Sequence, residues 1–323
     1  QLVWCYAKAL GLEKESLKMI PVRPNWSDDS DLIGFVDSMH SVYRPDDAGF
    51  VNTLIEASKA ENQDKLYLIC FDEMNLARVE HYFSQFLSIL EMPEQNRFLK
   101  LYAKEYETRL YNVDKYPSSV KIGNNLRFIG TVNMDESTFH FSDKVLDRAN
   151  VIQLDLVPYT EWRVGEGKKA EPEQTEPGQT ENKVWSYKKY GELVKELDLE
   201  KDILSARERE FLWKVHITLN GCSKTLGVGP RILKQIAKYL INLPKTESEE
   251  AISRREGFDI QFVQRVLTKV RGQKEQLYDI FDENVKTSLP KLFEEYSDVS
   301  DFEKSKKMLE VKKREIENYG YTL

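Results

Sequence analysis

Apolar residues in the first half of the chain form short runs that alternate with amphipathic stretches. Three runs have strand length: Leu66–Phe71, which is apolar without alternation, and the two further runs Leu126–Val132 and Val151–Val157. Such runs are typical of strands that are buried on both faces of a parallel sheet. Met19–Val22 predicts a further short strand, and Phe50–Lys59 has the periodicity of a helix. Strands separated by helices predict a mainly parallel, doubly wound α/β sheet.

Further elements are predicted around these strands. Residues 2–10 place their apolar side chains on one helical face, and Gly11 follows them as a C-cap. The apolar residues of 79–90 also fall on one helical face. Phe98–Ala103 and Val120–Ile122 alternate weakly, which favours an antiparallel pair inserted into the α/β region.

The second half of the chain has a different pattern. Residues 163–183 are rich in Pro, Gly, Glu, Gln and Thr, a composition typical of a flexible linker. From residue 184 onward the periodicity is helical, and Phe302, Leu309 and Ile316 recur every seven residues. That stripe is either a packing face or a short coiled-coil seam, and packing is favoured because three heptads are marginal. The sequence therefore predicts an α/β core over 1–162, a linker over 163–183 and an all-α region over 184–323.

Composition and charge narrow the range of functions. The 323 residues carry 47 basic and 54 acidic side chains, a net charge of −7, which offers no general attraction to nucleic-acid phosphates. Three widely spaced cysteines form no disulfide framework, which predicts a reduced, cytoplasmic location. No apolar run approaches the roughly 20 residues of a membrane span. Because of the net negative charge, any contact with DNA is expected from a local basic patch or from another chain.

The clearest chemical signal is the pair Asp72-Glu73 directly after the run Leu66–Phe71. Open α/β sheets bind ligands at the carboxyl ends of their strands. Neighbouring residues on an extended chain point in different directions, so Asp72 is placed to hold Mg²⁺ through water. Glu73 is placed to orient or deprotonate an attacking water. The alternative is a solvated helix N-terminus, where acidic residues suit the helix dipole.

Three further residues have weaker signals when each is taken alone. Asn133 follows a predicted buried strand and could hold the attacking water or a terminal phosphate, or simply form a turn. Arg148 could serve as an arginine finger in a neighbouring subunit, or pair with Asp143 or Asp147. Arg231 follows Pro230 at an expected helix start, where it could contact phosphate or simply face solvent.

Together, in this order and spacing, the signals resemble those of AAA+ nucleotidases. The segments Asp72–Glu91 and Gly130–Asn150 are similar to the McrB branch, the motor subunits of modification-dependent restriction systems in the MoxR and dynein-related group. The similarity is good over 1–162 and looser through the helical region. It implies an AAA+ core with a helical lid, Mg²⁺, and ATP or GTP as the substrate. It also implies a homo-oligomeric ring, most simply a hexamer, with an McrC-like nuclease partner and DNA reading by another domain or chain.

The resemblance also implies a role for each matching position. Asp72 and Glu73 match the Walker B pair, and Asn75 matches the asparagine that follows it. Asn133 matches the sensor 1 asparagine, and Arg148 matches one arginine of a three-arginine run. A nucleotide-contacting sensor 2 role for Arg231 rests on a looser match.

The sequence departs from the branch at three places. Glu136-Ser137 stands where the branch has Asp-Arg, so ATP is as good a candidate as GTP. One arginine replaces a run of three at Arg148. The phosphate loop G-x-x-x-x-G-K-[ST] is absent, and Gly221–Thr225 does not match it, because Ser223 stands where glycine is needed. We therefore expect the chain to begin just after that loop, within the helix that follows it.

Two hypotheses follow from these patterns. The first is a Mg²⁺-dependent nucleoside triphosphatase that drives a partner nuclease in an McrBC-like defence system and that is inactive in this form without its phosphate loop. The second is a catalytically inactive AAA+-like scaffold or regulatory protein. The presence of Asp72, Glu73, Asn133 and Arg148 together favours the first, because a scaffold has no physical need for all four.

Overall fold

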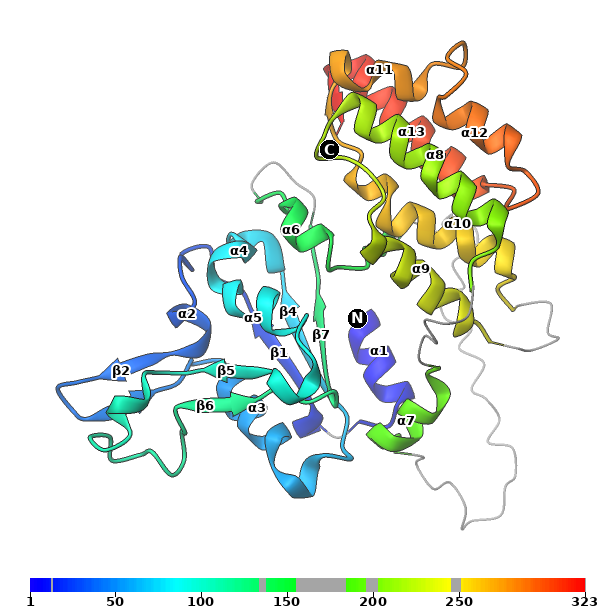
Figure 1. Ribbon diagram of the computed structural model, residues 1–323. Helices are drawn as coiled ribbons and strands as arrows, with labels where there is room; N and C mark the ends of the chain where they lie inside the picture. Colours follow the sequence, from blue (N-terminus) through cyan, green and yellow to red (C-terminus); the bar gives the residue numbers. More distant parts are fainter. Residues whose placement is uncertain (13, 134–137, 155–183, 196–202, 245–250, 323) are drawn as a thin grey trace, which may run out of the picture. The chain divides into compact units, whose positions relative to one another are not determined.

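The chain divides into two compact units in a computed structural model (Figure 1). Unit 1 comprises Gln1–Ser142 and Leu154–Gly191, and unit 2 comprises Asp143–Gln153 and Glu192–Leu323. The structure describes residues 1–12, 14–133, 138–154, 184–195, 203–244 and 251–322. The predicted linker 163–183 and the departure at Glu136-Ser137 lie outside these residues.

Unit 1 is built on a three-stranded parallel sheet. Its strands are β1 (Leu17–Pro21), β4 (Tyr67–Asp72) and β7 (Leu126–Gly130), in the order β1-β4-β7. The register pairs Cys70 with Met19 on one side and with Ile129 on the other. Residues 67–71 of the central strand are all buried. The predictions of a parallel sheet and of a buried strand in the run Leu66–Phe71 are thus confirmed, and the protein is an α/β protein.

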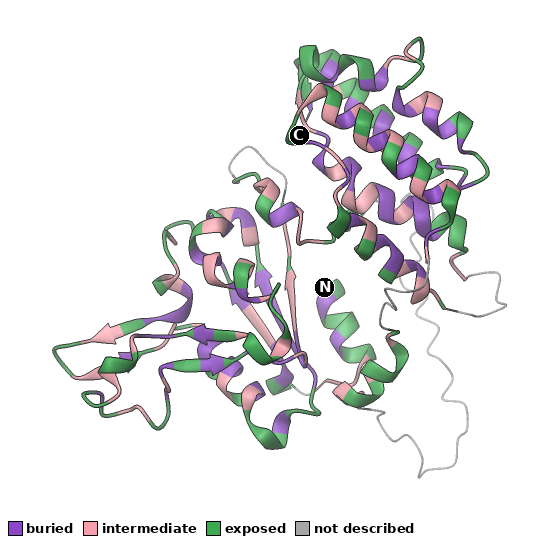
Figure 2. Cartoon of the chain, in the orientation of Figure 1, coloured by how far each residue is buried: buried purple, intermediate pink, exposed green. Residues whose placement is uncertain are grey.

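Helices cover both faces of this sheet. On one face, Val3 and Ala7 of α1 (Leu2–Ala9) pack against Leu68 and Cys70. Alternate residues of a strand point to opposite faces, so Phe71 lies on the other one. There its ring centroid is 5.7 Å from that of Phe50, in α3 (Phe50–Ser58), and 5.2 Å from that of Phe83. Burial is accordingly concentrated along β4 (Figure 2).

The other elements of unit 1 are short. They are α2 (Ser30–Ile33), β2 (Phe35–Asp37), β3 (Val42–Arg44), α4 (Val79–Tyr82), α5 (Ser84–Ile89), β5 (Phe98–Lys100) and β6 (Ser119–Lys121). The pairs β2–β3 and β5–β6 are antiparallel, as predicted for the second pair. The helix predicted over 79–90 is interrupted at Phe83, whose backbone leaves the helical region.

Unit 2 is helical in the part that the structure describes, apart from one short antiparallel pair. Its helices are α6 (Asp143–Leu146), α8 (Ala206–Cys222), α9 (Pro230–Ile241), α10 (Arg254–Arg265), α11 (Lys274–Phe281), α12 (Leu289–Glu295) and α13 (Glu303–Tyr319). The strands β8 (Gly272–Gln273) and β9 (Tyr321–Thr322) form the pair. Phe302, Leu309 and Ile316 are all buried in the core of this unit, so the stripe is a packing face.

Two predictions about the borders need correction. The strand predicted over Val151–Val157 is absent from 151–154, where Ile152 and Leu154 are exposed, and 155–157 lie outside the described residues. The predicted core ran unbroken to residue 162, but Asp143–Gln153 belongs to unit 2. Residues 184–191 belong to unit 1, where α7 (Tyr187–Leu193) begins beside Asp64, which accepts hydrogen bonds from two of its backbone amides. Contacts between residues that are far apart in the sequence therefore determine to which unit residues 143–153 and 184–191 belong.

Candidate functional site

The ends of β4 and β7 meet at one edge of the sheet of unit 1. Because the strands are parallel and Phe71 pairs with Gly130, the residues that follow each strand lie side by side. The Thr131 amide donates to the Phe71 carbonyl at 2.9 Å, and the Met74 amide donates to the Thr131 carbonyl at 2.8 Å. The backbone pairing thus continues past the strand ends and fixes the two acidic residues relative to the segment that leads to Asn133.

One hydroxyl group holds both acidic residues in place. Thr131 donates from Oγ1 to Oδ1 of Asp72 at 2.7 Å. The same oxygen accepts a hydrogen bond from the backbone amide of Glu73 at 2.9 Å. Asp72 is exposed, and among the described residues nothing bonds to its second carboxylate oxygen, Oδ2. Asp72 is thus an exposed carboxylate whose orientation the Thr131 hydroxyl fixes.

Glu73 has an unusual backbone conformation. Its φ of 53° and ψ of 51° lie in the left-handed region, which costs a residue other than glycine about 1–2 kcal/mol. The turn directs the Glu73 side chain to Asn133, whose Nδ2 donates to Oε1 of Glu73 at 3.1 Å. Both side chains are exposed. The structure thus brings Asp72, Glu73 and Asn133 together, as the sequence analysis predicts.

Asn75 lies beneath this group. It is 1% exposed, and its Nδ2 donates to the Asn133 carbonyl at 2.8 Å. Its Oδ1 is buried and has no partner among the described residues. The backbone amide of Phe139 in turn donates to the Asn75 carbonyl at 2.9 Å. Asn75 therefore bonds the backbone at Asn133 and at Phe139, and its own side chain is buried.

The exposed oxygens of Asp72 and Glu73 suit a hard divalent cation. Mg²⁺ is usually bound by one or two carboxylates, with water and substrate phosphates completing its octahedron. No group of three or more His, Cys, Asp or Glu side chains suitable for a metal occurs among the described residues. Two neighbouring exposed carboxylates are chemically suitable for holding a Mg²⁺ ion, directly or through water.

Arg148 belongs to the other unit. It follows α6, and its Nη1 donates to the Lys144 carbonyl at 2.6 Å. The alternative predicted for Arg148 was an ion pair with Asp143 or Asp147. These acids pair instead with Arg271, at 2.7 Å, and with Lys269. Arg148 therefore lies in unit 2, whereas Asp72, Glu73 and Asn133 lie in unit 1.

Arg231 is exposed in the first turn of α9, directly after Pro230, as predicted. The turn before it is fixed by His216, whose Nδ1 accepts a hydrogen bond from the Val228 amide at 3.2 Å. Gly227 has a φ of 150°, and a side chain there would collide with the His216 ring. The start of α9 is therefore well defined within unit 2.

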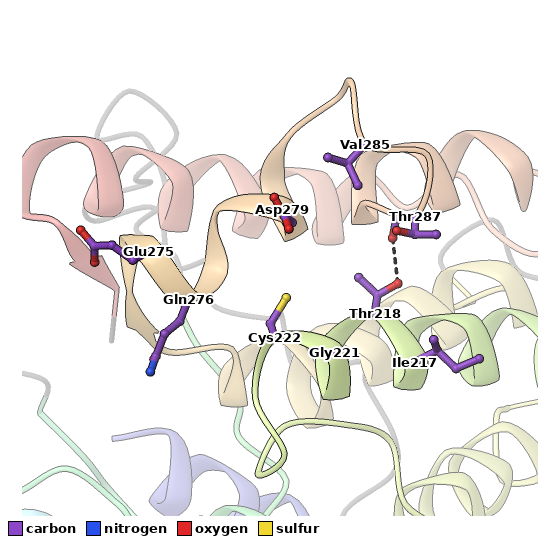
Figure 3. Close-up of a pocket in the computed structure, with 9 residues that line it drawn as sticks. All are labelled: Ile217, Thr218, Gly221, Cys222, Glu275, Gln276, Asp279, Val285 and Thr287. Atoms are coloured by element: carbon purple, nitrogen blue, oxygen red, sulfur yellow. Dashed lines mark hydrogen bonds between the residues drawn. The ribbon is translucent and has the colours of Figure 1, made fainter.

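Unit 2 also contains a separate pocket of about 560 Å³ between α8, α11 and the 282–288 turn (Figure 3). Thr218 spans it by donating to the Thr287 carbonyl at 2.8 Å. Burial, with the charge of Asp279, raises the pKa of the Cys222 thiol, which disfavours a reactive thiolate. Gly221 lies inside α8, so the stretch Gly221–Thr225 begins in a helix and does not form a loop around phosphate.

Thr131 is the site residue that the sequence analysis missed. Its hydroxyl makes two of the hydrogen bonds that orient the acidic pair. The available signal was its spacing: Thr131 and Asn133 are two residues apart at the end of a predicted strand, so they project on the same side. A threonine at a strand end is otherwise too common to single out.

Comparison with known proteins gives one match. A family model described as a domain of unknown function (DUF8727) matches residues 181–321. This match covers the helical part of the chain and leaves the carboxylate site outside it. No curated protein and no solved structure matches the chain. Within the part that the structure describes, every helix is too short or too polar to cross a bilayer.

Proposed function

We propose that this chain is the motor part of a Mg²⁺-dependent AAA+ nucleoside triphosphatase of the McrB branch. The observation that carries the proposal is the group of Asp72, Glu73, Thr131 and Asn133 at the carboxyl edge of a parallel sheet. It combines a carboxylate with a fixed orientation, a second carboxylate in a strained turn, and an amide directed at that second carboxylate. Strained backbone of this kind is found preferentially at functional sites.

Each side chain takes one role in the proposed reaction. Asp72 holds the water shell of Mg²⁺, and the ion supplies charge neutralisation on the phosphates when it is bound. Glu73 accepts a proton from the attacking water. The side-chain amide nitrogen of Asn133 donates a hydrogen bond to the Glu73 carboxylate. When Glu73 turns toward the attacking water, the same nitrogen can donate to that water. Arg148 stabilises the negative charge of the transition state at the site of a neighbouring subunit.

The partners are part of the same proposal. Because Arg148 acts on a neighbour, the protein assembles as a homo-oligomeric ring, most simply a hexamer. The substrate is ATP or GTP, and hydrolysis drives an McrC-like nuclease in a DNA restriction or defence system. With a net charge of −7, this chain leaves DNA reading to another domain or to a partner.

Hydrolysis by a full-length protein that supplies a phosphate loop tests the proposal. Glu73→Gln keeps the shape of the side chain and removes the base, so turnover should fall at least about a hundredfold while nucleotide binding persists. Glu105→Gln, at an exposed acid elsewhere in unit 1, is the matched control and should leave turnover unchanged. Undiminished hydrolysis by Glu73→Gln would refute the role of Glu73.

The same assay with mixed subunits tests Arg148. Arg148→Ala alone should be inactive, but mixing it with Glu73→Gln should restore activity at interfaces where each subunit supplies what the other lacks. Absence of rescue at every ratio contradicts a finger that acts in trans. If the full-length protein binds no Mg²⁺-nucleotide at all, the inactive scaffold becomes the better reading of the fold.

A further inference from the structure

The segment that carries Arg148 is attached to unit 2 by contacts along its whole length. Asp143 pairs with Arg271 at 2.7 Å, and Asp147 pairs with Lys269, whose side chain is 10% exposed. Both basic residues lie in the stretch that joins α10 to α11. Asp143 begins the single turn of α6 and Asp147 follows its last residue, so the two ion pairs hold both ends of this turn, and Asp147 immediately precedes Arg148.

A second set of contacts holds the residues just after Arg148. Arg265, in α10, donates to the Ala149 carbonyl at 3.1 Å and to Gln235 of α9 at 2.6 Å. Burial lowers the pKa of Arg265 to about 10, which still leaves it charged at neutral pH. Asn150 donates to Gln264 at 2.8 Å. Arg148 thus lies between two anchored stretches, and its backbone is fixed on both sides by α10 and the turn that follows it.

We infer that these contacts form a clip that makes Arg148 a side chain of the helical unit, so that the position of unit 2 determines where the finger acts. The inference rests on the proposed function for the role of Arg148, and on the described contacts for the clip itself. Asp143, Asp147, Lys269 and Arg271 are then positioning residues for the finger. Any movement of the helical unit, such as one that accompanies nucleotide binding, carries Arg148 with it.

A charge-reversal cycle tests the clip. Asp143→Lys places two cations together and should speed amide exchange across 144–150 about fivefold, which is the loss of one partly exposed ion pair. Arg271→Glu alone should act in the same direction. The double variant Asp143→Lys/Arg271→Glu restores the attraction and should return exchange close to the wild-type rate. Because Asp143→Lys also puts a cation at the start of α6, rescue by the double variant isolates the pair from the helix dipole.

Glu294→Lys is the matched control, since it reverses one charge of the exposed Lys291–Glu294 pair in α12 of the same unit. It should leave exchange across 144–150 unchanged. Unchanged exchange in Asp143→Lys, or failure of the double variant to restore it in a folded protein, overturns the clip. These measurements need no nucleotide, so they decide the clip even if the proposed hydrolysis is wrong.

The effect on the finger is measured in the full-length ring. Asp143→Lys should reduce turnover at least about tenfold without weakening nucleotide binding, and the double variant should recover most of it, because a displaced finger loses part of a large stabilisation. Undiminished turnover in Asp143→Lys, with faster exchange, overturns the positioning role. If Arg148→Ala itself leaves turnover intact, the finger assignment fails instead, and the exchange data still report on the clip.

Discussion

At Glu73 the chain accepts an unfavourable backbone conformation in order to place a side chain. The left-handed turn is held by the Thr131 hydroxyl, which bonds the Glu73 amide and the Asp72 carboxylate at once. A valine of nearly the same shape at position 131 could make neither bond. Thr131 is therefore a positioning residue whose removal should be visible both in stability and in the use of Mg²⁺.

We expect Thr131→Val to cost about 1–2 kcal/mol of stability in unit 1, because it removes two hydrogen bonds from a half-buried position. In the full-length protein, the Mg²⁺ concentration for half-maximal hydrolysis should rise about tenfold, as for other residues that orient a metal ligand. Urea unfolding and a Mg²⁺ titration measure the two effects. Thr131→Ser keeps the hydroxyl and should rescue the Mg²⁺ dependence; if it does not, the hydroxyl is not what orients Asp72.

Lys312 is a residue whose burial has a predictable pH signature. It is 4% exposed, and desolvation lowers its pKa from 10.5 to about 8, with Glu315 opposing the shift and Arg271 adding to it. The unfolded chain therefore binds more protons than the folded one between pH 8 and 10.5. Unit 2 should gain stability as the pH rises through that window.

Lys312→Met should remove this cost. The gap between a pKa of 10.5 and one of about 8 corresponds to roughly 3 kcal/mol, which is the upper limit of the gain at pH 7. Denaturant unfolding of wild type and variant at pH 7 and pH 10 measures it. The variant should be more stable at pH 7, with the difference shrinking toward pH 10. A difference that does not depend on pH would mean that packing, not charge, separates the two proteins.

Among the elements, α8 has the most completely specified N-terminus. Ser205 accepts from the Glu208 amide at 3.1 Å, while Oε2 of Glu208 accepts from the Ser205 amide at 2.6 Å, which forms a capping box. The same buried carboxylate accepts two hydrogen bonds from Arg254, at 3.0 and 2.9 Å. Glu208 therefore joins the start of α8 to the start of α10.

Substitution of Glu208 should accordingly cost more than substitution of its capping partner. We expect about 1 kcal/mol for Ser205→Ala and about 2–3 kcal/mol for Glu208→Ala, because the latter also strands the Arg254 charge. Thermal unfolding of the two variants measures the difference. Equal losses would show that the bonds to Arg254 add nothing to the capping box.

The sequence predicted elements correctly where residues close together in the chain determine the local conformation. Gly11 was expected to end the first helix, and it does so with a φ of 64° while the Leu12 amide bonds the Ala7 carbonyl. The run before Asp72 was correctly read as a buried parallel strand. The stretch 151–154 was read as a strand from its apolar residues, but its backbone pairs with no strand there. Apolar content alone does not specify a pairing partner.

The candidate site was predictable only in part. The strand ends indicated Asp72, Glu73 and Asn133, because parallel strands bring their carboxyl ends together. Thr131 was missed, since its role depends on a hydrogen bond across 59 positions of sequence. The attachment of Arg148 to unit 2 was missed for a related reason: Asp147 and Lys269 are 122 positions apart, and surface charges carry no signal of their partners.

On the scale of the whole molecule, each unit has a core of its own. The core of unit 2 contains a cluster of aromatic rings, in which Phe293 stacks on Phe302 at 4.8 Å. In unit 1, Phe86 stacks on Phe83 at the same centroid distance. The two clusters share no residue, so a cavity made in one should not remove packing from the other.

Phe293→Ala should destabilise unit 2 by about 3–5 kcal/mol, as expected for a fully buried phenylalanine. Hydrogen exchange followed by mass spectrometry should show faster exchange in α8, α10 and α13, with β4 unaffected. Phe86→Ala is the matched variant and should give the opposite pattern. Equal acceleration in both units for either variant would contradict separate cores and indicate a single cooperative transition.

The clip also has a consequence for the order in which the protein folds as it is made. The three strands that the structure describes in the sheet of unit 1 have all been synthesised once residue 130 is made. The Arg148 segment is synthesised soon afterwards, but Lys269 follows Asp147 only after another 122 residues. At about 5–20 residues per second, that delay is roughly 6–25 s. The nascent chain therefore contains the Asp72 and Glu73 strand end well before the Arg148 segment can make its contacts with Lys269 and Arg271.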